Sequence, residues 1–147
     1  MKKSILALVM VTTLNIITLN AEIKSKTAEF PTKEMKSQNK EVVRMAVEEI
    51  KSTLPQVVDK YTSFTDINNE GLTLVYTFEI NTGAKSDKTV IKDSKDRMQK
   101  VVKKGICQSS KRFLNSQINI SYAYINAITK APLYRFDITQ KDCIGVE

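Results

Sequence analysis

The chain has 147 residues, of which 23 are lysine or arginine and 16 are aspartate or glutamate, so its formal net charge is +7. It contains no histidine and only two cysteines. These counts exclude histidine-dependent catalytic triads, histidine-based zinc sites and four-cysteine zinc sites. The length suits a single folded domain, and the positive charge favours anionic partners without specifying a fold.

The first 21 residues have the pattern of a bacterial secretory signal peptide. Lys2 and Lys3 form a short positive start, an apolar run extends from Ile5 to Leu19, and Ala21 offers a small residue for cleavage. The apolar run is shorter than the roughly 20 residues that span a bilayer, which disfavours an uncleaved anchor. We therefore expect cleavage after Ala21 and a periplasmic or secreted product. Because no cysteine follows this position directly, we do not expect a lipid anchor.

The exported chain is expected to have a flexible lead-in over residues 22–33 and one domain over residues 34–147. A helix that begins after Thr32 or Ser37 is the first predicted element of the domain. It ends before Pro55, because proline disfavours the helical conformation of the residue that precedes it. Apolar residues recur at intervals of three and four, the spacing of one buried helix face: Val43, Ala46, Val47, Ile50 and Leu54.

A β-hairpin is predicted next, formed by residues 61–67 and 72–80. The intervening Asn68-Asn69-Glu70-Gly71 is typical of the turns that join hairpin strands. In the second of these strands apolar and more polar residues alternate over nine positions, which indicates one buried face.

A second helix is predicted from Ser86 or Asp87, either of which can cap its first turn. It extends to about Lys103. Gly105 could end the helix in a left-handed conformation, or the helix could continue through Cys107.

This second helix is strongly basic. Lysines three and four positions apart share a helix face, which defines a candidate basic surface: Lys88, Lys92, Lys95 and Lys103. Such a surface suits anionic lipid headgroups, phosphates or an acidic protein. Aspartates are interleaved with the lysines, however, so an ordinary hydrated helix face with local ion pairs is the favoured explanation. Export separates the protein from intracellular nucleic acid, which we do not expect as a partner.

A second hairpin, residues 118–125 and 133–139 joined around residues 126–132, completes the domain. The order helix–hairpin–helix–hairpin predicts an α+β fold, with two helices packed on one face of an antiparallel sheet of three or four strands. The other face of the sheet would be mildly polar, carrying Thr73, Thr77, Asn119, Ser121 and Arg135.

The two cysteines, Cys107 and Cys143, lie just before and just after the second hairpin. In an oxidising compartment such a pair is expected to form a disulfide. Closing this loop would stabilise the fold by about 4 kcal/mol in the chain-entropy model. No Cys-x-x-Cys motif is present, so the bond is expected to be structural.

Catalytic motifs are weak. Ser37 and Lys40 match the Ser-x-x-Lys spacing of penicillin-recognising enzymes, but their partner motifs are absent and a helix-cap serine explains them better. Paired carboxylates could serve a glycosidase, and the candidates are Asp59, Asp66, Glu79, Asp137 and Asp142. Solvated surface acids are the simpler explanation. We assign no catalytic residue, metal or cofactor.

Several segments together resemble a group of small exported bacterial proteins: Leu54-Pro55-x-x-Val58-Asp59-x-x-Thr62, Gly71-x-Thr73-Leu74-x-Tyr76, Ile106-Cys107, Ser121-Tyr122-x-Tyr124, Phe136-x-Ile138 and Asp142-Cys143. The resemblance covers roughly residues 54–143. It implies an exported small domain and supports the disulfide, and it implies no particular activity.

Three functional hypotheses follow. The first is a non-enzymatic binding module with a protein partner, such as an inhibitor, an immunity protein or a secretion accessory. The second is an envelope-associated protein whose basic helix contacts anionic lipid or cell wall, and the third is a small hydrolase. For the first hypothesis, strand 61–67 as a free sheet edge and the turn at 126–132 are the predicted contact surfaces.

Overall fold

The computed structural model describes residues 32–146, so the predicted signal peptide and nearly all of the predicted lead-in lie outside the described residues. The described chain forms α-helices, one mixed sheet and a short 3-10 helix, with these bounds: α1 (Lys33–Lys51), β1 (Gln56–Val57), β2 (Thr62–Glu70), β3 (Thr73–Ile80), α2 (Asp87–Ser109), α3 (Lys111–Asn115), β4 (Asn119–Asn126), β5 (Pro132–Ile138) and η1 (Gln140–Cys143).

The α+β class, the order of the two main helices and two hairpins, and the disulfide are confirmed. The predicted antiparallel sheet of three or four strands is wrong in two respects. The sheet has five strands in the order β1-β2-β3-β4-β5, and its central pair, β3 and β4, is parallel. The chain leaves β3, returns along α2 and enters β4 in the same direction, which is the crossover that parallel neighbours require.

The register aligns apolar side chains in rows across the helix-bearing face of the sheet. One row contains four aromatic rings from four strands, Phe64, Phe78, Tyr124 and Tyr134, with adjacent ring centroids 5.1 Å apart. Aromatic pairs at such distances add about 0.5–1.5 kcal/mol each to the stabilisation from burial. These rows form the central part of the core.

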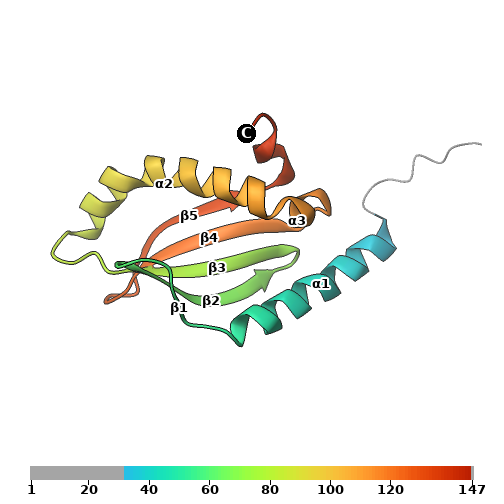
Figure 1. Cartoon of the computed structure of the whole chain (residues 1–147), viewed down its shortest axis with the longest axis horizontal. Helices are drawn as coiled ribbons and strands as arrows, with labels where there is room; N and C mark the ends of the chain where they lie inside the picture. Colours follow the sequence, from blue (N-terminus) through green and yellow to red (C-terminus); the bar gives the residue numbers. More distant parts are fainter. Residues whose placement is uncertain (1–31, 147) are drawn as a thin grey trace, which may run out of the picture.

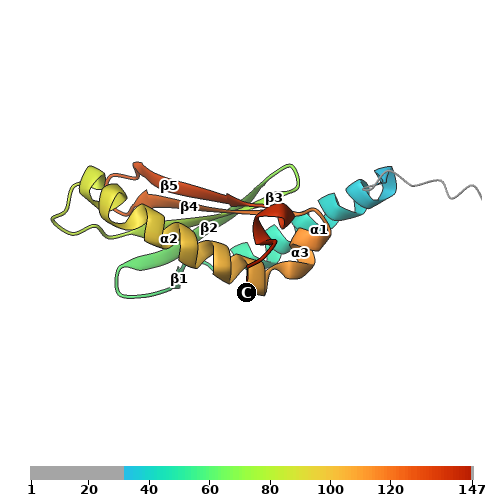
Figure 2. The same ribbon diagram turned by 90° about the horizontal axis from the view of Figure 1, so that it is seen from above.

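The two long helices cover different strands of this face. α1 packs on β2 and β3, whereas α2 packs mainly on β5. Figure 1 shows α1 and α2 along opposite edges of the sheet, and Figure 2 shows α2 and α3 on one side of it. Both helices begin at predicted caps, since Thr32 Oγ1 accepts a bond from the Met35 amide and Ser86 Oγ accepts one from the Thr89 amide.

α2 ends later than Gly105, at Ser109. The helix continues because Val102 and Ile106, four residues apart, are both buried against the sheet. Of the two alternatives at Gly105, continuation through Cys107 is therefore the correct one.

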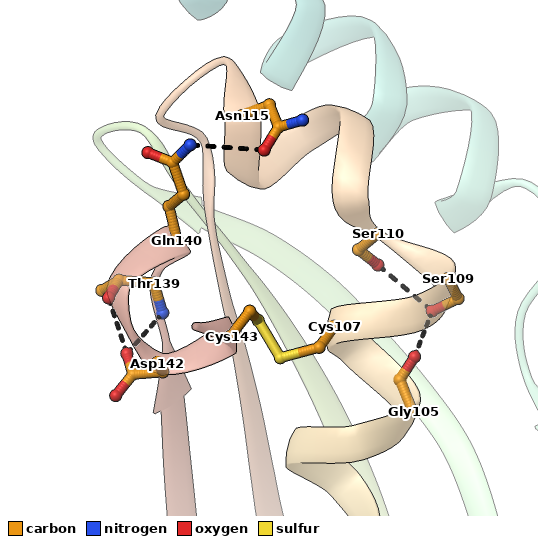
Figure 3. The surroundings of a disulfide bond; sticks show 9 residues. All are labelled: Gly105, Cys107, Ser109, Ser110, Asn115, Thr139, Gln140, Asp142 and Cys143. Carbon is orange, nitrogen blue, oxygen red and sulfur yellow. Dashed lines mark hydrogen bonds between the residues drawn. A yellow bond between two sulfur atoms is a disulfide. The ribbon is translucent and has the colours of Figure 1, made fainter. Parts of the chain in front are cut away.

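The disulfide joins α2 to η1. The Cα atoms of Cys107 and Cys143 are 5.4 Å apart, and Figure 3 shows the bond between the helix and the C-terminal turn. Within η1, the Asp142 carboxylate accepts hydrogen bonds from the hydroxyl of Thr139 at 2.6 Å and from its amide at 2.8 Å. These bonds lower the pKa of Asp142. The C-terminal turn is thus held both covalently and by local hydrogen bonds.

The face of the sheet opposite the helices carries the predicted polar residues, and an ion pair crosses it. The guanidinium of Arg135 on β5 bonds both carboxylate oxygens of Glu70 on β2, at 2.9 and 2.8 Å. Because β3 and β4 lie between those strands, the pair passes over their outer side chains. Val75 and Ser121 are consequently 4% and 0% exposed although no helix covers them.

Replacing both cysteines with serine should lower the free energy of unfolding by about 2–4 kcal/mol, because the unfolded chain regains the entropy of a loop spanning 36 residues. Urea denaturation with and without a reductant measures this. The native protein should lose stability on reduction, while the Cys107→Ser/Cys143→Ser variant should not respond. An equal response of both proteins would contradict the expectation.

Arg135→Lys should shift the urea midpoint downward, because an ammonium cannot form the two parallel bonds that the guanidinium donates to Glu70. Glu70→Gln should have a similar effect, and the double variant should lose little more than either single variant. Raising the salt concentration should reduce the difference in urea midpoint between each variant and the native protein. Additive losses would show that the two side chains act independently.

Candidate functional site

The carboxylates considered for catalysis do not meet in the structure. Asp66 pairs with Lys51 at 3.2 Å, Glu79 pairs with Lys130 at 2.7 Å, and Asp137 pairs with Arg135. Ser37 and Lys40 are both exposed on α1. Each candidate therefore lies in a separate surface environment.

Metal binding and membrane spanning have no support within residues 32–146. No group of three or more cysteine, aspartate or glutamate side chains in this range could hold a metal ion. None of the helices in this range combines the length and the apolar character needed to cross a bilayer.

One predicted partner-binding surface is corrected in part. β1 covers the first half of strand 61–67, since Gln56 lies opposite Phe64 and Val57 opposite Ser63, and the register pairs no residue of β1 with the part of β2 after Phe64. β1 could not be predicted from the sequence, because two residues carry no detectable alternation. The other predicted surface, the turn after Asn126, is exposed over residues 128–130.

The candidate basic surface lies on the flank of α2 that faces β5 and η1. Lys88, Lys92 and Lys95 are exposed and form no ion pair with any residue in 32–146. Lys103 lies one turn before Cys107, and Lys92 lies within about 60° of Cys107 around the helix. Lys88 and Lys95 instead precede the buried Val102 at spacings of fourteen and seven, so they lie nearer the side of α2 that packs on the sheet. Lys103 is half-buried, and its charge helps to lower the pKa of Asp142.

A second surface, which sequence analysis did not identify, lies between α1 and α2. Tyr76 on β3 and Tyr122 on β4 lie side by side, with ring centroids 5.2 Å apart, in the middle of the helix-bearing face. Both are only half-buried. We call Tyr76, Tyr122 and the adjacent Tyr124 the tyrosine surface. Tyr124 itself is a core residue, only 5% exposed, so Tyr76 and Tyr122 are the open part of this group.

The hydroxyls of the tyrosine surface have no hydrogen-bond partner among the described residues. Within residues 32–146, Ser121 Oγ is the one side-chain nitrogen or oxygen that is buried without a hydrogen-bond partner. The three phenol oxygens are therefore accessible to solvent. The tyrosine surface thus combines apolar rings with unused donors and acceptors, a composition typical of protein interfaces.

Burial of the rings raises the pKa of all three tyrosines. The pKa of Tyr76 rises to about 12, mainly through desolvation and further through the neighbouring Tyr122. Desolvation also raises the pKa of Tyr122 and of Tyr124. The charge of Asp59, in the loop between β1 and β2, adds to the rise in the pKa of Tyr124.

The helices supply apolar walls. Val101 of α2 is 64% exposed and lies beside Lys100, Lys104 and Gly105 of the same helix. On α1, Val42 and Lys51 lie on opposite sides of the helix. Lys51 pairs with Asp66 on the outer face of the sheet. Val42 therefore lies on the flank directed toward α2, and it is 38% exposed.

An open cavity of about 620 Å³ lies where α2 begins, between this helix and the ends of β2 and β3. Its wall includes Ile80 from β3, Tyr61 from the loop before β2, and Val90 and Arg97 from α2. Val90, Arg97 and Val101 are spaced by seven and four residues, so the cavity and the exposed Val101 share one helix flank.

The two faces of the sheet differ in whether their charged side chains form ion pairs. On the outer face the acids Asp66, Glu70, Glu79 and Asp137 all pair with basic side chains. On the helix side, Arg97, Lys100 and Lys104 of α2 form no ion pair within the described range. Unpaired charge, exposed aliphatic groups and half-exposed aromatic rings therefore coincide on one side of the molecule.

Comparison with known proteins is informative only at the level of fold. No protein-family model matches the sequence, and no curated protein matches it. A Pseudomonas aeruginosa protein classed as secreted has a similar structure, with a TM-score of 0.66 and 10% identity over 76% of this chain and 98% of the other.

Two type II secretion system pilotins are also similar in structure. EpsS from Vibrio vulnificus has a TM-score of 0.56 and 14% identity over 76% of this chain and 97% of its own. AspS from Vibrio cholerae has a TM-score of 0.56 and 14% identity over 75% of this chain and 96% of its own. At these identities the likeness shows a common fold.

Stability should fall as pH rises from about 10 to 12. Tyr76 keeps its proton in the folded state at pH values where the unfolded chain has released it, so the folded state binds more protons in this range. Urea midpoints measured across this range, together with tyrosinate absorbance, test this. Tyr76→Phe should flatten the decline, and an unchanged slope in that variant would contradict the assignment.

Proposed function

We propose that this protein is a non-enzymatic, exported accessory of an envelope secretion system, and that it acts by binding a segment of a protein partner on the tyrosine surface. The observation that carries the proposal is the pair of half-exposed tyrosines at the centre of the helix-bearing face. A sheet face that served only as core would have these rings covered.

The structural likeness to pilotins favours a secretion role. Two type II secretion pilotins share the fold over nearly their whole length, and the predicted signal peptide agrees with an envelope location. The scattered carboxylates and the absence of histidine offer no competing catalytic arrangement.

The partner segment should be a helix with one apolar face. Tyr76 and Tyr122 are half-exposed on the helix-bearing face, and a third helix placed over them would bury both rings. Exposed Val42 and Val101 would contact its sides. Grooves of this kind bind amphipathic helices through apolar residues at intervals of three and four.

Charge favours an acidic flank on that helix. Arg97, Lys100 and Lys104 lie along α2 at spacings of three and four and have no acidic partner in the described chain. Acidic side chains on the partner would pair with them and increase the association rate.

Site-specific photo-crosslinking tests the proposal. A benzoylphenylalanine in place of Tyr122 should crosslink one envelope protein in cells, because this side chain is half-exposed on the helix-bearing face. The same group at Thr77, on the outer face, is the matched control. Equal crosslinking from both positions, or none from Tyr122, would contradict the proposed surface.

A charge in the wall of the surface should weaken the complex. Val101→Glu places a carboxylate where an apolar contact is expected and should reduce the crosslink at Tyr122 at least tenfold. Since Val101 is exposed, the fold should tolerate the change, which circular dichroism would verify. In a strain that lacks the gene for this protein, expression of the native chain should restore the amount of the crosslinked partner in the envelope. Expression of the Val101→Glu variant should not.

A further inference from the structure

We infer that the flank of α2 facing β5 and η1 docks on an anionic phospholipid bilayer. This inference does not depend on the proposed function, because the flank lies on the opposite side of α2 from the tyrosine surface. It gives the basic row on α2 a specific partner.

The first observation is an excess of unpaired positive charge. Between Lys88 and Lys104 the helix has seven basic and two acidic residues. One of the acids, Asp93, is within 4.0 Å of Lys85. The other, Asp96, lies one turn after Lys92 and forms no ion pair in the described chain. Lys88, Lys92 and Lys95 therefore present a net positive surface.

The second observation is a pair of exposed isoleucines at the two ends of this row. Ile128 is 74% exposed and Ile144 is 81% exposed. Few aliphatic side chains in the described chain are as exposed, and neither belongs to the tyrosine surface or its walls.

Hydrogen bonds and the disulfide place both isoleucines beside α2. Asn126 is buried, and its amide nitrogen donates to Asp87 in the first turn of α2 at 2.7 Å. Its amide oxygen accepts from the backbone N–H of Ile128 at 2.8 Å, so the turn with Ile128 lies at the start of the helix. At the other end, Ile144 directly follows Cys143, which is bonded to Cys107 of α2.

Both isoleucines also lie on the β5 side of the helix. Ile128 is in the turn that enters β5, and Ile144 follows the 3-10 helix that leaves it. The row Lys88–Lys92–Lys95 lies between them along the helix. The arrangement is a basic surface with an aliphatic side chain at each end.

These features favour a bilayer over a soluble polyanion. Lysines near an anionic membrane gain electrostatic attraction, and aliphatic side chains gain by insertion among the headgroups and acyl chains. A wall polymer or a nucleic acid would use the lysines and leave the isoleucines in water.

A bilayer on this flank would leave the tyrosine surface free. The two flanks of α2 face in different directions, toward β5 in one case and toward α1 in the other. The protein could thus rest on a membrane and hold its partner at the same time.

Vesicle flotation tests the inference with the chain that begins at Glu22, which includes every described element. Vesicles of phosphatidylcholine with about 30% phosphatidylglycerol should bind the protein, pure phosphatidylcholine vesicles should not, and binding should weaken with salt. A variant with Lys88→Gln, Lys92→Gln and Lys95→Gln should bind the anionic vesicles at least tenfold more weakly, because each lysine near the surface contributes about fivefold.

The matched control is Lys33→Gln, Lys36→Gln and Lys40→Gln on α1, which changes net charge by the same amount on another helix. It should bind nearly as well as the native chain. Equal losses in the two triple variants would overturn the inference, because only total charge would then matter.

Substitution of the two isoleucines distinguishes binding to a bilayer from binding to a soluble polyanion. Ile128→Ser with Ile144→Ser should weaken vesicle binding severalfold without changing charge, and should leave binding to soluble polyglutamate unchanged. If the double variant binds vesicles as well as the native chain does, the lipid assignment is wrong. Val101→Glu should bind vesicles as well as the native chain does, although it should lose the partner complex. Loss of partner binding and loss of membrane binding can therefore be told apart.

Discussion

The parallel pairing of β3 with β4 is the constraint on which the rest of the structure depends. It places Phe78 beside Tyr124 and Tyr76 beside Tyr122, so that rings contributed by separate hairpins form continuous rows. Because two parallel neighbours need a long connection, α2 must cross the sheet between them. The same pairing therefore builds the aromatic core and positions the basic helix along β5.

The main elements could be predicted from local pattern. The alternation over residues 72–80 indicated β3, the three-and-four spacing before Pro55 indicated α1, and Thr32 and Ser86 were correctly identified as possible caps. The direction of β4 relative to β3 could not be predicted, because alternation is the same in parallel and antiparallel neighbours. β1 was missed because two residues are too few to show a period.

The candidate site could be predicted only in part. The lysine row was visible in the sequence because helical spacing alone brings Lys88, Lys92 and Lys95 together. The tyrosine surface was not visible, because Tyr76 and Tyr122 have the alternating spacing of ordinary core residues. What leaves them half-exposed is the separation of α1 from α2, which depends on tertiary packing rather than on any local signal. The spacing of residues along a strand predicts the face on which a ring lies and not whether a helix covers that face.

The ion pair between Arg135 and Glu70 connects the sheet's shape to both helices. Since it joins β5 to β2 across the outer face, it draws together the two strands on which α2 and α1 rest. A contact between strands at the two sides of a sheet favours a bent sheet, and the bend of a sheet affects the distance between helices on its other face. Residues that no partner touches would thus determine the width of the strip in which a partner helix has to fit. In the proposed complex, the binding surface would thus depend on a pair of charges on the opposite face of the sheet.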